Sequence, residues 1–201
     1  FAAAVIEAAR RAYPSIAGNG DYTAVAAHQR DRLRRAVEEA RAAGAVVLTH
    51  GEAAGDLGKF APTVILDPPL DGLLMREEIF GPVLPVLGYR NLDEAIAFVA
   101  ARDRPLALYG FSNDAATRGR LLTGATSGGV TLNGVLLHIA QDSLPFGGVG
   151  ASGTGAYHGR DGFRRFSHAR AVHRIGPINM FERFGPPWSG LGRRIGQWLS
   201  R

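Results

Sequence analysis

The chain of 201 residues contains no cysteine and only one lysine, Lys59. Without cysteine it can form neither a disulfide nor a zinc site with thiolate ligands, and it offers no thiol nucleophile. It also lacks a signal-peptide pattern and any apolar run near the ~18 residues that a membrane-spanning helix needs. Because 46% of the residues are hydrophobic, one well-buried core can form. We therefore expect a globular, cytoplasmic protein.

Acidic residues are scarce at the C-terminal end. Residues 1–159 carry 14 arginines and lysines against 16 acidic residues, whereas residues 160–201 carry nine arginines against Asp161 and Glu182. A basic end can bind nucleic acid or an anionic membrane surface. These arginines are not interleaved with aromatic residues on one regular face, which disfavours nucleic-acid binding. We expect an arginine-rich, solvated tail and no nucleic-acid partner.

Helical and extended patterns alternate along the chain. Apolar spacing predicts helices over 1–13 and about 23–43, which Pro14 and Gly44 end. Further helices begin at Asn91 and at Asn113 or Asp114, where side chains can cap them. Short apolar runs predict strands over 45–48, 63–66, 82–87, 106–111 and 129–133. This order predicts an α/β fold with a mainly parallel sheet and flanking helices, in which Pro85 moves its strand toward an edge.

Residues 76–83 contain the sequence Glu77-Glu78-Ile79-Phe80-Gly81-Pro82. A carboxylate beside a tight Gly-Pro turn can accept hydrogen bonds from two vicinal hydroxyls, as a ribose presents them. Alternatively, the two glutamates are a solvated pair and Phe80 belongs to the core.

A glycine-rich segment follows Leu144, and Gly148, Gly150 and Gly153 fit the dinucleotide-binding fingerprint as a bare string. That fingerprint requires a preceding strand, a following helix and an acidic residue ~20 positions further on. None of these is predicted here, so we reject a phosphate-binding role. The six histidines lack metal-ligand spacing, and neither a serine-hydrolase elbow nor a Walker A sequence occurs.

Several segments together resemble the aldehyde dehydrogenase superfamily, in its order and at about its spacing, over residues 1–175. They are Glu78-Ile79-Phe80-Gly81-Pro82, Ser127-Gly128-Gly129-Val130, Leu144-Pro145-Phe146-Gly147-Gly148, Gly153-Thr154-Gly155 and Gly162-Phe163-Arg164-Arg165-Phe166-Ser167-His168. The runs 133–138 and 155–159 are most similar to the branch that holds coniferyl aldehyde dehydrogenases and the class-three and fatty aldehyde enzymes. The resemblance implies an incomplete catalytic domain over 1–174, followed by a tail over 175–201.

The resemblance also implies roles for five residues. Glu78 would bind the cofactor ribose and Phe80 would pack near the nicotinamide of NAD or NADP. Phe146 would line the substrate tunnel, and Leu137 and His138 would shape the preference for an aldehyde, with aromatic aldehydes such as coniferyl aldehyde among the candidates. A catalytic His138 ranks low, because a lone histidine at a strand end is more often a hydrogen-bonded structural residue.

In this family a cysteine thiolate attacks the aldehyde, hydride passes to NAD(P), and a glutamate-activated water releases the acid. The resemblance puts that cysteine and that glutamate upstream of Phe1, so we expect this chain alone to be inactive and the parent enzyme to be a homo-oligomer, such as a dimer. The alternative is a non-catalytic pseudoenzyme or structural α/β module. In the tail, apolar residues at helical spacing beside arginines favour docking on a subunit or domain over weak contact with an anionic membrane.

Overall fold

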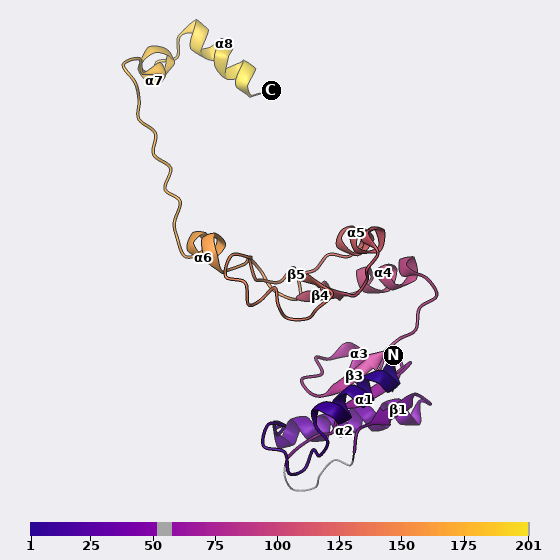
Figure 1. Cartoon of the computed structure of the whole chain (residues 1–201). Helices are drawn as coiled ribbons and strands as arrows, with labels where there is room; N and C mark the ends of the chain where they lie inside the picture. Colours follow the sequence, from indigo (N-terminus) through magenta and orange to yellow (C-terminus); the bar gives the residue numbers. More distant parts are fainter. Residues whose placement is uncertain (52–57, 201) are drawn as a thin grey trace. The chain divides into compact units, whose positions relative to one another are not determined.

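The computed structural model describes residues 1–51 and 58–200 (Figure 1). The chain forms two compact units, residues 1–98 and 99–201. In the part of the chain that the structure describes, no helix is long and apolar enough to cross a membrane. The predicted boundary between a catalytic portion and a tail near residue 174 stays a prediction, and Arg201, the last residue of that tail, lies outside the described residues.

The first unit contains a three-stranded sheet in the order β1–β2–β3, formed by Val46–Thr49, Thr63–Leu66 and Val83–Val86. Strands β2 and β3 are parallel, whereas β1 runs antiparallel to β2. The mainly parallel α/β arrangement is confirmed, with β1 as its exception. Pro85 lies in β3 opposite Ile65, and β3 is an edge strand of the described sheet, as a residue without an N–H donor requires.

Both faces of β2 are buried, because helices cover the sheet on each side. Val64 packs against Ala2 and Ile6 of α1 (Ala2–Ala12), while Ile65 packs against Leu33 of α2 (Ala27–Ala42). Successive strand residues point to opposite faces, so the two helices lie on opposite sides of the sheet. Full burial of each such side chain contributes about 1.5–3 kcal/mol.

Helix α2 begins four residues later than the sequence predicts. The Val25 N–H donates to the Gly58 carbonyl at 2.7 Å, and the Arg30 Nη1 donates to the Val25 carbonyl at 2.7 Å. These bonds hold the chain before Ala27 in an extended path. Tertiary hydrogen bonds therefore decide the helix start here, rather than the local helical pattern.

The loop between α1 and α2 is fixed by its contacts with Lys59 and Phe60. The Lys59 ammonium donates to the carbonyls of Ile16 at 3.0 Å and Ala17 at 3.2 Å. The Tyr22 hydroxyl donates to the Phe60 carbonyl at 2.7 Å. Burial, and secondarily the neighbouring Tyr13, raise the pKa of Tyr22 above its ordinary value.

The second unit holds two parallel strands, β4 (Ala107–Gly110) and β5 (Gly129–Leu132), with α5 (Ala115–Gly124) between them in sequence. Helix α4 (Leu92–Ala100) spans the boundary between the units. The predicted caps are confirmed: Asn91 Oδ1 accepts the Glu94 N–H at 3.0 Å, and Asp114 Oδ2 accepts the Thr117 N–H at 2.7 Å. These contacts fix the starts of α4 and α5.

The remaining helices are short. They are α3 (Leu73–Arg76), α6 (Gly159–Arg165), α7 (Met180–Phe184) and α8 (Gly190–Leu199). The amphipathic pattern of the tail is thus helical, as α8 shows. Helix α3 is a single turn that leads directly into Glu77, so it sets the entry into the Glu-Glu motif.

Candidate functional site

The segment 77–82, here called the clamp turn, connects α3 to β3. Phe80 adopts a left-handed backbone conformation with φ of 47°, which is uncommon for a bulky residue and costs about 1–3 kcal/mol. The turn ends where the Val83 N–H donates to the Gly81 carbonyl at 2.9 Å and the Thr63 N–H donates to the Pro82 carbonyl at 2.9 Å. The second bond attaches the turn to β2 in the centre of the sheet.

Gly81 lies directly against the core side chain Leu33 of α2. A Cβ atom at Gly81 would come within 3.0 Å of Leu33 Cδ1 and 3.5 Å of its Cγ. Leu33 is only 1% exposed, so its side chain has little room to move away. The glycine of the motif is therefore required by packing, because no larger side chain fits between the clamp turn and α2.

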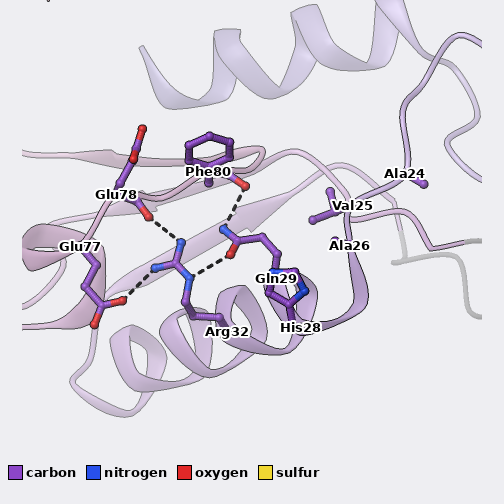
Figure 2. A pocket seen from close by; sticks show the side chains of 9 residues that line it. All are labelled: Ala24, Val25, Ala26, His28, Gln29, Arg32, Glu77, Glu78 and Phe80. Atoms are coloured by element: carbon purple, nitrogen blue, oxygen red, sulfur yellow. Dashed lines mark hydrogen bonds and ion pairs between the residues drawn. The ribbon is translucent and has the colours of Figure 1, made fainter. Parts of the chain in front are cut away.

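An open hollow of about 680 Å³ lies between the clamp turn and the start of α2 (Figure 2). The Glu78 and Phe80 side chains project from the turn on the side away from Arg32, and Phe80 is 73% exposed. The lining is formed by Ala24, Val25, Ala26, His28, Gln29, Arg32, Glu77, Glu78 and Phe80. The structure therefore brings Glu78 and Phe80 together, and Phe80 is not a core residue.

The two adjacent glutamates have different surroundings. Glu77 accepts a hydrogen bond and ion pair from Arg32 Nη1 at 3.0 Å. Among the described residues, the Glu78 carboxylate has no hydrogen-bond or ion-pair partner, and only its backbone carbonyl is bonded. An exposed, ionised carboxylate accepts hydrogen bonds only. Glu78 is thus available to bind a ligand with neighbouring hydroxyl donors, whereas Glu77 is occupied.

Two α2 side chains hold the backbone of the clamp turn from below (Figure 2). Arg32 Nη2 donates to the carbonyls of Glu78 and Ile79, and Gln29 Nε2 donates to the carbonyls of Ile79 and Phe80. The sequence interpretation missed both residues, since it assigned the helix over about 23–43 from apolar spacing alone and gave its polar side chains no role. Their spacing of three positions places them on one helix face, which is the only sequence signal that could have indicated them.

In the second unit, the predicted tunnel residues follow β5. Asn133 directly follows this strand, with φ of 55°. Its Oδ1 accepts the Ser112 N–H at 2.8 Å, and its Nδ2 donates to the Ser112 carbonyl at 3.2 Å. The ends of the two parallel strands are therefore tied together. Leu137, four residues further on, is 62% exposed.

His138 and Phe146 lie in one aromatic cluster, with ring centroids 6.1 Å apart. His138 is 8% exposed, and its Nδ1 lies 2.8 Å from Thr131 Oγ1, while its Nε2 has no partner among the described residues. Phe146 also contacts Tyr157 edge-on at 5.6 Å. His138 is thus a buried side chain held by a strand threonine, and the low rank of a catalytic His138 stays a prediction.

The glycine-rich segment after Phe146 folds back on itself. Phe146 and Tyr157 form an antiparallel bridge with two hydrogen bonds of 2.9 Å, and Gly150 bridges Gly153. This hairpin-like loop neither follows a strand nor opens a helix as the dinucleotide fingerprint requires. The segment thus lacks the strand and helix of the fingerprint, and the absence of a phosphate-binding role stays a prediction. Within the described residues, no cluster of three potential metal ligands occurs.

The tail contains a second hollow, an apolar groove of about 350 Å³ between α7 and α8. Ser189 caps α8 by accepting the Gly192 N–H at 3.1 Å. A side chain at Gly192 would meet the Phe184 carbonyl at 2.5 Å, so this glycine permits the two helices to approach. The groove is lined by Phe184, Gly185, Trp188, Gly192, Ile195, Gly196 and Leu199.

A model described as the aldehyde dehydrogenase family matches residues 6–172. A probable coniferyl aldehyde dehydrogenase of Caulobacter vibrioides is 54% identical over 171 residues, covering 82% of this chain and 35% of the relative. The coniferyl aldehyde dehydrogenase of Pseudomonas sp. strain HR199 is 46% identical over 172 residues, covering 83% of this chain and 36% of the relative.

Solved structures agree with these sequence matches. An NAD-dependent aldehyde dehydrogenase from Sinorhizobium meliloti superposes with a TM-score of 0.67 at 32% identity, covering 76% of this chain and 31% of that one. The chain therefore spans about a third of the length of the proteins it is similar to.

Proposed function

Because this chain belongs to the aldehyde dehydrogenase family, we propose that it supplies the cofactor-ribose clamp and part of the substrate-tunnel wall of an NAD(P)-dependent aldehyde dehydrogenase. The proposed reaction converts an aldehyde, water and NAD(P)⁺ into the carboxylic acid, NAD(P)H and a proton. The nicotinamide, when bound, accepts the hydride.

The observation that carries the proposal is the geometry of Glu78 and Phe80. Glu78 presents to the hollow a carboxylate that none of the described residues binds, beside the exposed Phe80 ring. Two vicinal ribose hydroxyls could each donate to one carboxylate oxygen. A nicotinamide joined to that ribose would then lie within reach of the flat face of Phe80.

Phe146, Leu137 and His138 are proposed to form the tunnel wall. Phe146 would contact the substrate as an aromatic surface, and the exposed Leu137 would contribute apolar area. His138 would act indirectly, by supporting Phe146 through their ring contact. An aromatic aldehyde similar to coniferyl aldehyde is the proposed substrate class, because both curated relatives compared above carry that substrate in their names.

The thiol nucleophile is proposed to lie outside these residues, since the chain has no cysteine. The general-base glutamate is proposed to lie outside them as well. The chain alone would then be inactive. The choice between NAD and NADP also depends on residues that contact the adenosine ribose, which the proposal locates outside this chain. A homodimer, a cytoplasmic location and a docking role for the tail complete the proposal, with weak contact to an anionic membrane as the alternative for the tail.

A chimera tests the proposal. This chain replaces the matching third of the Pseudomonas enzyme, and NAD(P)H formation with coniferyl aldehyde is followed at 340 nm. We expect aldehyde-dependent turnover from the chimera and none from the isolated chain. A folded chimera that retains the Pseudomonas cysteine and yet shows no turnover would contradict the proposal and favour the non-catalytic module. The mass of the chimera by light scattering tests the dimer.

Glu78→Gln in this chimera tests the clamp itself. A neutral amide oxygen is a weaker acceptor than a carboxylate, so we expect a rise of about 10-fold or more in KM for the cofactor, with the KM for aldehyde unchanged. The matched control is Glu38→Gln, which removes an exposed carboxylate of α2 that forms an ion pair with Arg41. Equal cofactor KM values for the two variants would exclude Glu78 as a ribose ligand.

A further inference from the structure

Arg32 is almost fully occupied by protein acceptors. Its Nε donates to Gln29 Oε1 at 3.1 Å, its Nη1 to Glu77 Oε2 at 3.0 Å, and its Nη2 to the carbonyls of Glu78 at 2.5 Å and Ile79 at 2.7 Å. The side chain is only 22% exposed. A guanidinium has five N–H donors, and four contacts with the protein leave little capacity for a ligand.

The backbone acceptors of this network are consecutive carbonyls of the clamp turn. Gln29 adds bonds to Ile79 at 2.7 Å and Phe80 at 3.0 Å, so the carbonyls of residues 78, 79 and 80 all point at α2. This segment belongs to no helix or strand, and its carbonyls would otherwise need water as a partner. The two side chains therefore replace the ladder that regular secondary structure would provide.

The direction of these carbonyls fixes the direction of the side chains. With three successive carbonyls held on the α2 side, the Glu78 and Phe80 side chains project from the opposite side of the turn (Figure 2), and both residues line the hollow. The left-handed conformation of Phe80 is unfavourable by itself and persists only where its surroundings impose it. The bond from Gln29 to the Phe80 carbonyl and the bonds from Arg32 to the two preceding carbonyls are the contacts that can impose it.

We propose that Arg32 and Gln29 are positioning residues that orient Glu78 and Phe80 toward the cofactor, and that Arg32 does not itself bind a cofactor phosphate. Glu77 contributes by pairing with the guanidinium and offsetting its positive charge, which weakens any attraction for a phosphate. The planar fork of arginine suits this task because it can reach several acceptors at fixed angles. This inference rests on the proposed function of the clamp.

The test is a double-mutant cycle in the chimera described above. We expect Arg32→Met to raise the KM for the cofactor about 10-fold and to leave the aldehyde KM within about twofold. If Arg32 acts through Glu78, the same substitution in a Glu78→Gln background should change the cofactor KM less than about twofold, because residues that act as a unit are not additive. Effects that multiply in full would overturn the positioning role and assign Arg32 a direct contact with the cofactor.

The matched control is Arg34→Met. Arg34 lies on the same helix and forms an exposed ion pair with Asp31 at 2.8 Å, so its loss should leave the cofactor KM unchanged. Gln29→Ala is the second variant if Arg32→Met fails to fold, and it should raise the cofactor KM less than Arg32→Met. A Gln29→Ala variant with unchanged kinetics and unchanged amide hydrogen exchange in the clamp turn would count against the positioning role of Gln29 and Arg32.

Hydrogen exchange separates this inference from the proposed function. Peptides that cover residues 77–86 should exchange at least about 10-fold faster in Arg32→Met than in Arg34→Met, while α2 itself stays protected. This outcome is expected even if the unsubstituted chimera proves inactive. In that case the enzymatic proposal fails, but Arg32 and Gln29 still hold the clamp turn in place. Unchanged hydrogen exchange in the clamp turn of Arg32→Met would refute the positioning role of Arg32, whatever the activity of the chimera.

Discussion

Gly81→Ala is expected to damage the clamp turn by overpacking it against α2. The new methyl group would lie within 3.0 Å of Leu33 Cδ1, whereas ordinary carbon contacts begin near 3.4 Å. The turn and Leu33 must therefore separate by about 0.5 Å or more. Leu33 sits in the cluster that contains Ile65 and Val83, so the displacement spreads to the core rather than to solvent.

Two magnitudes follow from that contact. Inserting one methyl group into a packed core costs about 1–3 kcal/mol. A catalytic geometry shifted by 1 Å loses up to about 100-fold in rate, so a shift of half that size should lower kcat/KM for the cofactor by about 10-fold. Steady-state assays of the chimera at 340 nm, together with its thermal unfolding midpoint, measure the two effects separately.

A second substitution makes the steric reasoning testable. Leu33→Ala removes the clashing atoms and alone should cost about 2–5 kcal/mol through the cavity it leaves. In the Gly81→Ala background it should cost less, because the new methyl group fills part of that cavity, and the cofactor kcat/KM should recover. Gly88→Ala is the control, since a Cβ there meets nothing within 4 Å. Gly81→Ala behaving like Gly88→Ala, or a strictly additive double variant, would refute the argument.

Three further outcomes are expected in the same chimera. Asn133→Ala should lower the free energy of unfolding by about 1–2 kcal/mol, since it loses both bonds to Ser112 and puts alanine in a left-handed backbone conformation. Asn133→Gly should lose less, because glycine tolerates that conformation. Equal unfolding midpoints for Asn133→Ala and the parent would contradict this. The raised pKa of Tyr22 means that the folded state favours the neutral phenol. Its contribution to the free energy of unfolding is therefore full below pH 10 and is lost as the pH rises from 10 through the folded pKa. Tyr22→Phe should flatten this alkaline loss of stability while costing about 1 kcal/mol for the bond to Phe60, and an unchanged alkaline stability profile would argue against this. Deleting residues 175–201 should abolish any co-sedimentation with anionic vesicles, and if the intact chimera does not sediment with them, the membrane alternative for the tail is excluded.

The sheet could be predicted from sequence because short apolar runs carry their own limits. Strand 63–66 is bounded by Pro62 and Pro68, and the structure gives Thr63–Leu66 without change. The antiparallel direction of β1 had no such signal, because an apolar strand has the same composition in either direction. Direction depends on the connection, and a loop between neighbouring strands permits an antiparallel pair without a crossover.

Long-range hydrogen bonds explain most of what the sequence could not predict. The start of α2 depends on a bond from Val25 to Gly58, more than 30 positions away. The contacts of Arg32 with the clamp turn are also distant in sequence, joining residues 45 to 47 positions apart. Helical periodicity places a side chain on a face, but only the folded chain reveals which loop lies against that face.

The predicted cofactor residues, Glu78 and Phe80, come together in the first unit. The predicted tunnel residues, Leu137, His138 and Phe146, belong to the second unit, where the rings of His138 and Phe146 lie 6.1 Å apart. The sequence indicated the low catalytic rank of His138 from residue type alone. The structure adds the surroundings of this side chain, which is buried and lies 2.8 Å from Thr131 Oγ1.

The motif is informative because each of its positions satisfies a different physical requirement. Glu77 pairs with the partly buried Arg32, and Glu78 lines the hollow, where it can bind a ligand. Gly81 fits against a core leucine, and the Pro82 carbonyl accepts a hydrogen bond from the central strand. Neutralising either glutamate by a Glu→Gln change removes the same charge, yet the consequences should differ: Glu77→Gln should loosen the turn and raise its exchange rate, whereas Glu78→Gln should leave exchange unchanged and weaken cofactor binding directly. If both variants gave the same pattern, the assignment of separate roles to these neighbours would be wrong, and net charge at the hollow would be the better explanation of cofactor affinity.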